Sequence, residues 1–205
     1  GAINTLKPWM LDLPEAEQAD ILAKQGRPPF GVEMMIEGDD GTPQPHDGVA
    51  QGELKVRGPW VCRAYFKNED AEAHRDGWFG TGDVATVDAD GYMQIVDRKK
   101  DMIKSGGEWI SSIDLEDLAM RHPDIAQAAV IGIAHPKWDE RPLLLVTAAP
   151  GRNPQRNDVL QFLESKVAKW WVPDEMIVVD SFPVGGTGKI LKTDLRETYR
   201  DFRFP

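Results

Sequence analysis

The densest group of cations in the chain lies in the stretch DRKKDMIKSGGEWISS, residues 97–112. Four basic side chains share seven residues of it and precede a Gly106–Gly107 pair: Arg98, Lys99, Lys100 and Lys104. Glycine adopts positive φ readily and lets a ligand approach the backbone closely. Cations beside such a turn suit an anionic ligand, most simply a phosphate. A β-hairpin with a solvated basic face fits the same residues, because most runs of charge are surface.

A second candidate cation, Lys189, directly follows the segment Gly185-Gly186-Thr187-Gly188. This composition predicts a flexible loop that can deliver an ammonium to a closed site. A positioned cation that acts on charge developing in a transition state accelerates a reaction by about 10²-fold or more. The segment is not a Walker phosphate loop, because Pro183 replaces the first glycine and Ile190 the Ser/Thr.

Two further residues have the chemistry of nucleotide ligands. Asp83 follows Thr81-Gly82, and a carboxylate in a tight corner can accept hydrogen bonds from the vicinal hydroxyls of a ribose. Its alternative role is to cap a turn. Arg98, with five donors and a permanent charge, suits a ribose or phosphate. Its alternative role is a surface ion pair with Asp97 or Asp101, which would contribute little.

The order of three segments carries a family resemblance. GWFGTGD (residues 77–83), the basic stretch and GGTGKILK (residues 185–192) resemble the adenylate-forming superfamily: acyl-CoA synthetases, luciferases and the adenylation domains of peptide synthetases. DRKKDMIKSGGEWISSIDLE, HPKWDERPLL and TGKILKTDLR resemble medium- and long-chain fatty-acyl-CoA synthetases in particular. The similarity covers nearly the whole chain.

The resemblance implies roles for individual residues. Asp83 would bind the 2′ and 3′ hydroxyls of AMP, Arg98 would contact the nucleotide, and Lys189 would contact the carboxylate and α-phosphate during adenylation. Lys100 would be the hinge about which a C-terminal domain rotates. Five residues would line the pantetheine tunnel, with ordinary core packing as the alternative for the last: Lys104, Ser105, Gly106, Gly107 and Trp109.

The implied reaction is that of an acid–thiol ligase, a fatty-acid–CoA ligase. A fatty acid or other carboxylic acid and ATP form acyl-AMP and pyrophosphate, with Mg²⁺ on the phosphates, and CoA then displaces AMP. The family's phosphate loop, magnesium ligands and acyl pocket are not in these 205 residues. We therefore expect them before Gly1, and expect this C-terminal portion to be inactive by itself. A non-catalytic lid-like module that binds CoA or a partner, and an enzyme that loads a carrier protein, are the alternatives.

Composition limits the classes of ligand and partner that the chain can bind. The net charge of −10 argues against nucleic-acid binding, which requires a basic surface. The single cysteine, Cys62, cannot form an internal disulfide, which suits a reducing cytoplasm. No apolar run is long enough to span a membrane, and His46 and His74 have no clustered ligands for a metal. Apolar surface on the first part could support a homodimer.

The pattern of residues predicts an α+β fold with two domains. An antiparallel, barrel-like β subdomain covers residues 1–97, a hinge 98–100, and a small mobile α+β lid 101–205 with a three-stranded sheet and helices. Predicted elements of the first part are a helix over 14–25 with an apolar stripe, and a hairpin of 84–87 and 92–96. In the second part we predict helices over 113–121, from 153, and over 191–199, and strands over 126–134, 142–149 and 176–180. Ser111 or Ser112 would cap the first of these helices, and Asn153-Pro154 would start the next.

Overall fold

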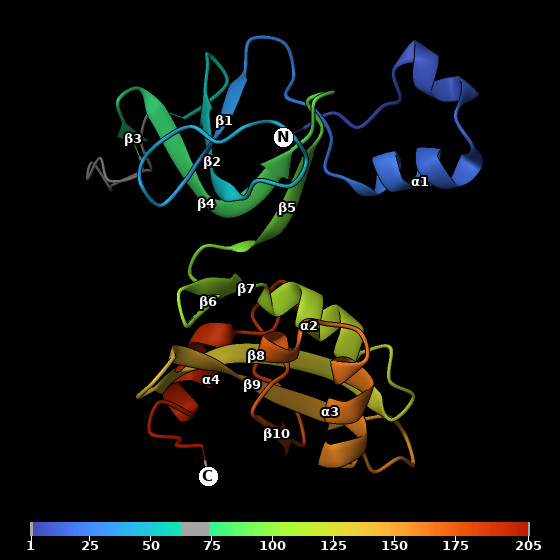
Figure 1. The fold of residues 1–205 in the computed structure, drawn as a ribbon, viewed down its shortest axis with the longest axis vertical. Helices are drawn as coiled ribbons and strands as arrows, with labels where there is room; N and C mark the ends of the chain where they lie inside the picture. Colours follow the sequence, from blue (N-terminus) through green and yellow to red (C-terminus); the bar gives the residue numbers. More distant parts are fainter. Residues whose placement is uncertain (1, 63–73, 205) are drawn as a thin grey trace. The chain divides into compact units, whose positions relative to one another are not determined.

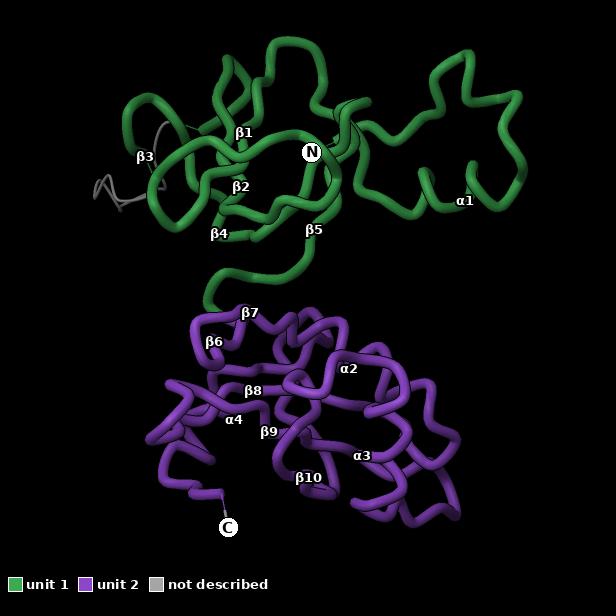
Figure 2. Tube along the Cα trace, viewed as in Figure 1, with its two compact units in different colours: residues 1–100 green, residues 101–205 purple. Residues whose placement is uncertain are grey.

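The computed structural model describes residues 2–62 and 74–204. The chain divides into two compact units, residues 1–100 and 101–205 (Figure 2). Unit 1 is mostly antiparallel sheet, and unit 2 combines a sheet with helices (Figure 1). The predicted α+β class is confirmed. None of the helices in the described ranges has the length and apolar character to cross a membrane.

Unit 1 is organised around one long strand, β4, which pairs antiparallel with β2, β3 and β5, while β1 extends the sheet beyond β2. Five apolar side chains form its core: Ile36, Leu54, Ala85, Val87 and Met93. The strands are β1 (Glu33–Glu37), β2 (Gly52–Arg57), β3 (His74–Arg75), β4 (Trp78–Val87) and β5 (Met93–Arg98).

The β4–β5 hairpin is the element that the sequence predicted most directly. Its turn is closed by hydrogen bonds from Gly91 N to Asp88 O (2.9 Å) and from Asp88 N to Tyr92 O (3.0 Å). Gly91 has φ +84°, a conformation that costs glycine little. The ladder continues past the predicted strand ends and sets Asp83 opposite Arg98.

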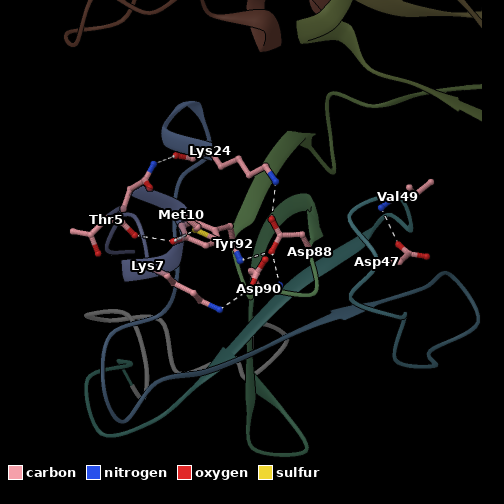
Figure 3. Close-up of polar contacts among 10 residues, drawn as sticks. Thr5, Lys7, Met10, Lys24, Asp47, Val49, Asp88, Asp90 and Tyr92 are labelled. Atoms are coloured by element: carbon pink, nitrogen blue, oxygen red, sulfur yellow. Dashed lines mark hydrogen bonds and ion pairs between the residues drawn. The ribbon is translucent and has the colours of Figure 1, made fainter. Parts of the chain in front are cut away.

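The N-terminal segment is attached to this hairpin by polar contacts. It contains η1 (Pro8–Asp12) and α1 (Glu15–Ala23). Lys24 Nζ lies 2.6 Å from Asp88 Oδ2 and Lys7 Nζ 2.9 Å from Asp90 Oδ1 (Figure 3). The predicted helix exists, but α1 has no buried residue, and Ala19, Leu22 and Ala23 of its predicted apolar stripe are exposed among the described residues.

Unit 2 has a sheet of five strands rather than the three predicted. The order is β10-β9-β6-β7, with β8 also paired to β9. The two additional strands come from the basic stretch, because its glycine turn closes a hairpin whose Ser105 pairs with Asp139 on β9. The strands are β6 (Ile103–Ser105), β7 (Glu108–Ile110), β8 (Ile125–His135), β9 (Asp139–Ala148) and β10 (Glu175–Val178).

Successive side chains of a strand point to opposite faces, and apolar clusters cover both faces of the β8–β9 ladder. Val130 and Leu144 belong to one apolar cluster with residues of α2 (Ser112–Ala119) and α3 (Arg156–Glu164). Ala129 and Leu145 belong to another with Leu195 of α4 (Lys192–Thr198). A short helix, η3 (Lys169–Trp171), precedes β10.

The helix starts test the predicted caps. Ser111 caps α2, and its Oγ accepts a hydrogen bond from Asp114 N (3.1 Å). The start predicted at Asn153-Pro154 is wrong, because α3 begins at Arg156 after Gln155. Pro154 is buried in the non-helical segment before the helix, and the N-cap residue Gln155 is extended.

Candidate functional site

Asp83 and Arg98 lie directly opposite each other on β4 and β5. Arg98 Nε is 2.9 Å from Asp83 Oδ1, and the side chains are 58% and 17% exposed, respectively. The side-chain partner of Arg98 is therefore Asp83, and not Asp97 or Asp101 as the surface-pair alternative had it. The sheet thus places a partly buried carboxylate beside an exposed guanidinium.

The corner before Asp83 is held by hydrogen bonds. Thr81 Oγ1 donates to Leu54 O on β2 (3.0 Å) and accepts from Asp83 N (3.1 Å). Gly82 has φ +74°, which favours glycine, and its carbonyl accepts from Lys99 N (2.9 Å). These contacts fix the backbone on both sides of the Asp83–Arg98 pair.

Lys100 is an exposed turn residue at the end of unit 1. Its neighbours are tied to different units. Lys99 Nζ is 2.6 Å from Glu53 Oε2 in unit 1, and Asp101 Oδ1 is 2.5 Å from Arg196 Nη2 in unit 2. Lys100 is thus the residue between two anchored positions.

The basic hairpin of unit 2 brings together the residues from Lys104 to Trp109. Lys104 and Trp109 are cross-strand partners, with Lys104 Nζ 5.4 Å from the centre of the half-buried Trp109 ring. Gly106 and Gly107 have φ of +61° and +90°. A Cβ on Gly106 would lie 3.0 Å from the Trp138 ring, so any larger residue there would also force this ring to shift.

Ser105 is buried beneath that turn and is held by an arginine that we did not predict as a site residue. Arg141 Nη1 donates to Ser105 Oγ (3.0 Å), and its Nε donates to both carboxylate oxygens of Asp174 (3.0 Å each). Arg141 itself is only 8% exposed. The ERP segment of the sequence therefore supports the hairpin from within unit 2.

Lys189 lies in a hydrogen-bonded loop rather than in an open one. Val184 and Ile190 form an antiparallel bridge. Gly185 N donates to Lys189 O (2.8 Å), Gly188 N to Gly185 O (2.9 Å) and Leu191 N to Pro183 O (2.8 Å). The side chain of Lys189 is exposed, so the loop presents its ammonium to solvent.

A partly buried cation at the base of this loop, Lys192, was missed by the sequence reasoning. It is the first residue of α4, where the helix dipole disfavours a positive charge. That conflict was the available signal that a tertiary partner holds this lysine.

Among the residues that the structure describes, no three His, Cys, Asp or Glu side chains gather as a metal site.

Comparisons with known proteins agree with the resemblance. Residues 114–189 match the family described as AMP-binding enzyme C-terminal domain. The chain is 57% identical, over 92% of its length, to 3-methylmercaptopropionyl-CoA ligase of Ruegeria lacuscaerulensis, of which it covers 35%. It is 49% identical, over 98% of its length, to the medium-chain-fatty-acid–CoA ligase of Ectopseudomonas oleovorans, of which it covers 37%.

A solved structure gives the same result. The o-succinylbenzoate CoA synthetase MenE of Bacillus subtilis, in complex with the acyl-adenylate OSB-AMP, matches 90% of this chain with a TM-score of 0.78 and 30% identity, over 37% of its own chain. The chain thus spans about a third of the length of these relatives. It is similar to one part of these CoA ligases, and residues 114–189, within its second unit, match the AMP-binding enzyme C-terminal domain.

Proposed function

We propose that this chain works as part of an ATP-dependent acyl-CoA synthetase. In the first step an oxygen of the carboxylate forms a bond to the α-phosphorus of ATP, and pyrophosphate leaves with the electrons of the broken P–O bond. In the second step the thiolate of CoA bonds to the acyl carbon and AMP leaves. The Asp83–Arg98 pair is the observation that carries this proposal, because it joins two residues implied as nucleotide ligands in one place.

The pair suits a ribose. A carboxylate has two oxygens with several lone pairs, and Asp83 uses Oδ1 for Arg98. The other oxygen can accept from a ribose hydroxyl, and the exposed guanidinium retains donors for the nucleotide. The partial burial of Asp83 favours tight hydrogen bonds, since water competes less there.

Lys189 supplies the positive charge for adenylation. An ammonium beside the α-phosphate and the attacking carboxylate offsets negative charge that grows in the transition state. Magnesium on the ATP phosphates would supply further neutralisation, and we assign its ligands to the part of the enzyme that this chain does not span.

The basic hairpin is the proposed site for the pantetheine arm of CoA. The positive φ at Gly106 and Gly107 turns their backbone outward without a side chain, which allows close approach. Lys104 and the half-buried Trp109 ring would flank the arm, with Ser105 holding the turn from below.

Lys100 is the proposed hinge about which unit 2 rotates between its two roles, adenylation with Lys189 and CoA binding with the basic hairpin. A hinge requires only a few residues that absorb a backbone rotation. Because Lys99 and Asp101 are anchored to separate units, rotation would concentrate at Lys100.

We place the substrate among the carboxylic acids, fatty acids in particular. We place the enzyme in the cytoplasm, since a single cysteine fits a reducing compartment.

The test is to express the full-length enzyme that contains this chain and to measure each half-reaction separately. We expect fatty-acid-dependent exchange of pyrophosphate into ATP, and acyl-CoA formation when CoA is added. The 205-residue chain alone should show neither. Absence of any carboxylate-dependent exchange in the full-length enzyme would overturn the proposal. If the full-length enzyme transferred its acyl group only to a carrier protein, the acyl acceptor would be that protein and not CoA.

A further inference from the structure

A partly buried ion pair lies at the base of the Lys189 loop. Lys192 Nζ is 2.6 Å from Glu116 Oε1 and donates to Ser112 Oγ at 2.7 Å. Both charged side chains are only 14% exposed. Ser112 and Glu116 stand four residues apart on α2 and so share one face of the helix. One ammonium therefore joins the start of α4 to α2.

The same carboxylate reaches the central sheet. Glu116 Oε1 accepts a hydrogen bond from Val130 N on β8 (2.6 Å). Burying two charges is costly unless each is paired and hydrogen-bonded, and Lys192 stands where its own helix disfavours it. Local preference does not explain this residue, but its contacts with Ser112 and Glu116 on α2 do.

The backbone of the loop links the position of Lys189 to that of Lys192. Backbone bonds between Pro183 and Leu191 and between Gly185 and Lys189 make it a short hairpin. One arm begins at Phe182, which is buried in the apolar cluster with Leu195. The other arm runs from Lys189 to Lys192, so the ion pair is the polar anchor of the arm that carries the exposed lysine.

We propose that Glu116 and Ser112, acting through Lys192, are positioning residues for Lys189. This inference rests on the proposed role of Lys189 in adenylation. The ion pair holds the lysine arm at a fixed place on unit 2, so that the Lys189 ammonium is delivered with defined geometry. Lys192 itself is held by its α2 partners and contacts no substrate in this scheme.

Glu116→Gln is the sharpest test, because the amide keeps the shape and an acceptor for Val130 N but removes the charge that holds Lys192. In the full-length enzyme we expect adenylation to fall about 10- to 100-fold, the range for a displaced catalytic group. Thioester formation from supplied acyl-AMP should change little. Glu197→Gln on α4, which breaks an exposed pair with Arg200, is the matched control and should alter neither step.

A second readout does not depend on catalysis. In the 205-residue chain, hydrogen exchange at the amides of Gly185, Gly188 and Leu191 should accelerate in Glu116→Gln and stay unchanged in Glu197→Gln. Lys192→Arg, which preserves the charge, should retain slower exchange than Lys192→Met and more of the adenylation activity. If wild-type enzyme made no acyl-AMP, the proposed function would fail while the exchange data still tested the anchor.

Two results would overturn the inference. One is an equal loss of both half-reactions in Glu116→Gln that follows its loss of thermal stability, since that pattern means general destabilisation. The other is unchanged amide exchange in the loop of a folded variant, which circular dichroism would verify.

Discussion

The two units hold their candidate residues in different ways. In unit 1, Asp83 and Arg98 face each other across a β ladder, and each is the ion-pair partner of the other. In unit 2, Lys189 is exposed on a hairpin loop, and the partly buried pair of Lys192 and Glu116 lies at the base of the loop. Register positions the first group, and a tertiary anchor positions the second.

The difference suits the two proposed tasks. A ribose site benefits from ligands that are already in place before the nucleotide binds, because ordering them later costs affinity. A lysine that must enter and leave a reacting site benefits from an exposed tip on a firm base. Substitutions should therefore affect binding in unit 1 and a single chemical step in unit 2.

The largest effect is expected at Lys189. In the full-length enzyme, Lys189→Ala should lower the rate of acyl-AMP formation by about 10²-fold or more, because a positioned transition-state charge is lost. Thioester formation from supplied acyl-AMP should change far less. Rapid-quench measurement of the two half-reactions checks this, and equal losses in both would contradict the assigned role.

A smaller, binding-type effect is expected in unit 1. Asp83→Asn should raise the KM for ATP about 10- to 100-fold, which corresponds to losing a hydrogen bond to a charged group. Glu33→Gln is a matched control, since Glu33 and Arg57 form another cross-strand pair with 2.6 Å between charged atoms. Similar rises in KM for both variants would show that Asp83 is not a nucleotide ligand.

Substitution of two glycines, one in the sheet and one in the loop, allows the two regions to be compared directly. Gly82 and Gly188 have φ of +74° and +76° with open space where a Cβ would stand, so alanine would cost each about 1–2 kcal/mol if the backbone stayed in place. We expect Gly82→Ala to lower Tm by several degrees. Gly188→Ala should lower Tm less, since a loop can relax, but should slow adenylation. Thermal scans and half-reaction assays would reveal the opposite order if the loop were the stiffer region.

The smallest effect concerns acid stability of unit 1. Burial raises the pKa of Asp88, but hydrogen bonds from the Lys24 ammonium and from Tyr92 N outweigh it, and the pKa lies below its ordinary value of 3.8. The unfolded chain then binds the proton more readily, so this stabilisation is present above about pH 4 and is lost as pH falls through the lower, folded value. Lys24→Gln should flatten the acid side of the urea-unfolding profile. An unchanged profile would mean that the contact contributes nothing.

Local signals predicted the elements that depend on neighbouring residues. The Asp88–Gly91 turn, the cap at Ser111 and the strands β8 and β9 were found because turn, cap and alternation patterns act over a few positions. The start at Pro154 and the packing of α1 were not, because both depend on what lies against them in space. The β6–β7 hairpin was one of the two interpretations of the basic stretch, but its addition to the unit 2 sheet depends on pairing between Ser105 and Asp139.

The sequence by itself determined the candidate residues, since Asp83, Arg98 and Lys189 stand in segments whose residue types already indicate their chemistry. Tertiary structure alone decided which charges meet. The partners Asp83 and Arg98, Arg196 and Asp101, and Lys192 and Glu116 are separated along the chain. Ion pairs between different elements follow no sequence period, unlike those within one helix, so only the packing of strands and helices brings such groups within reach of each other.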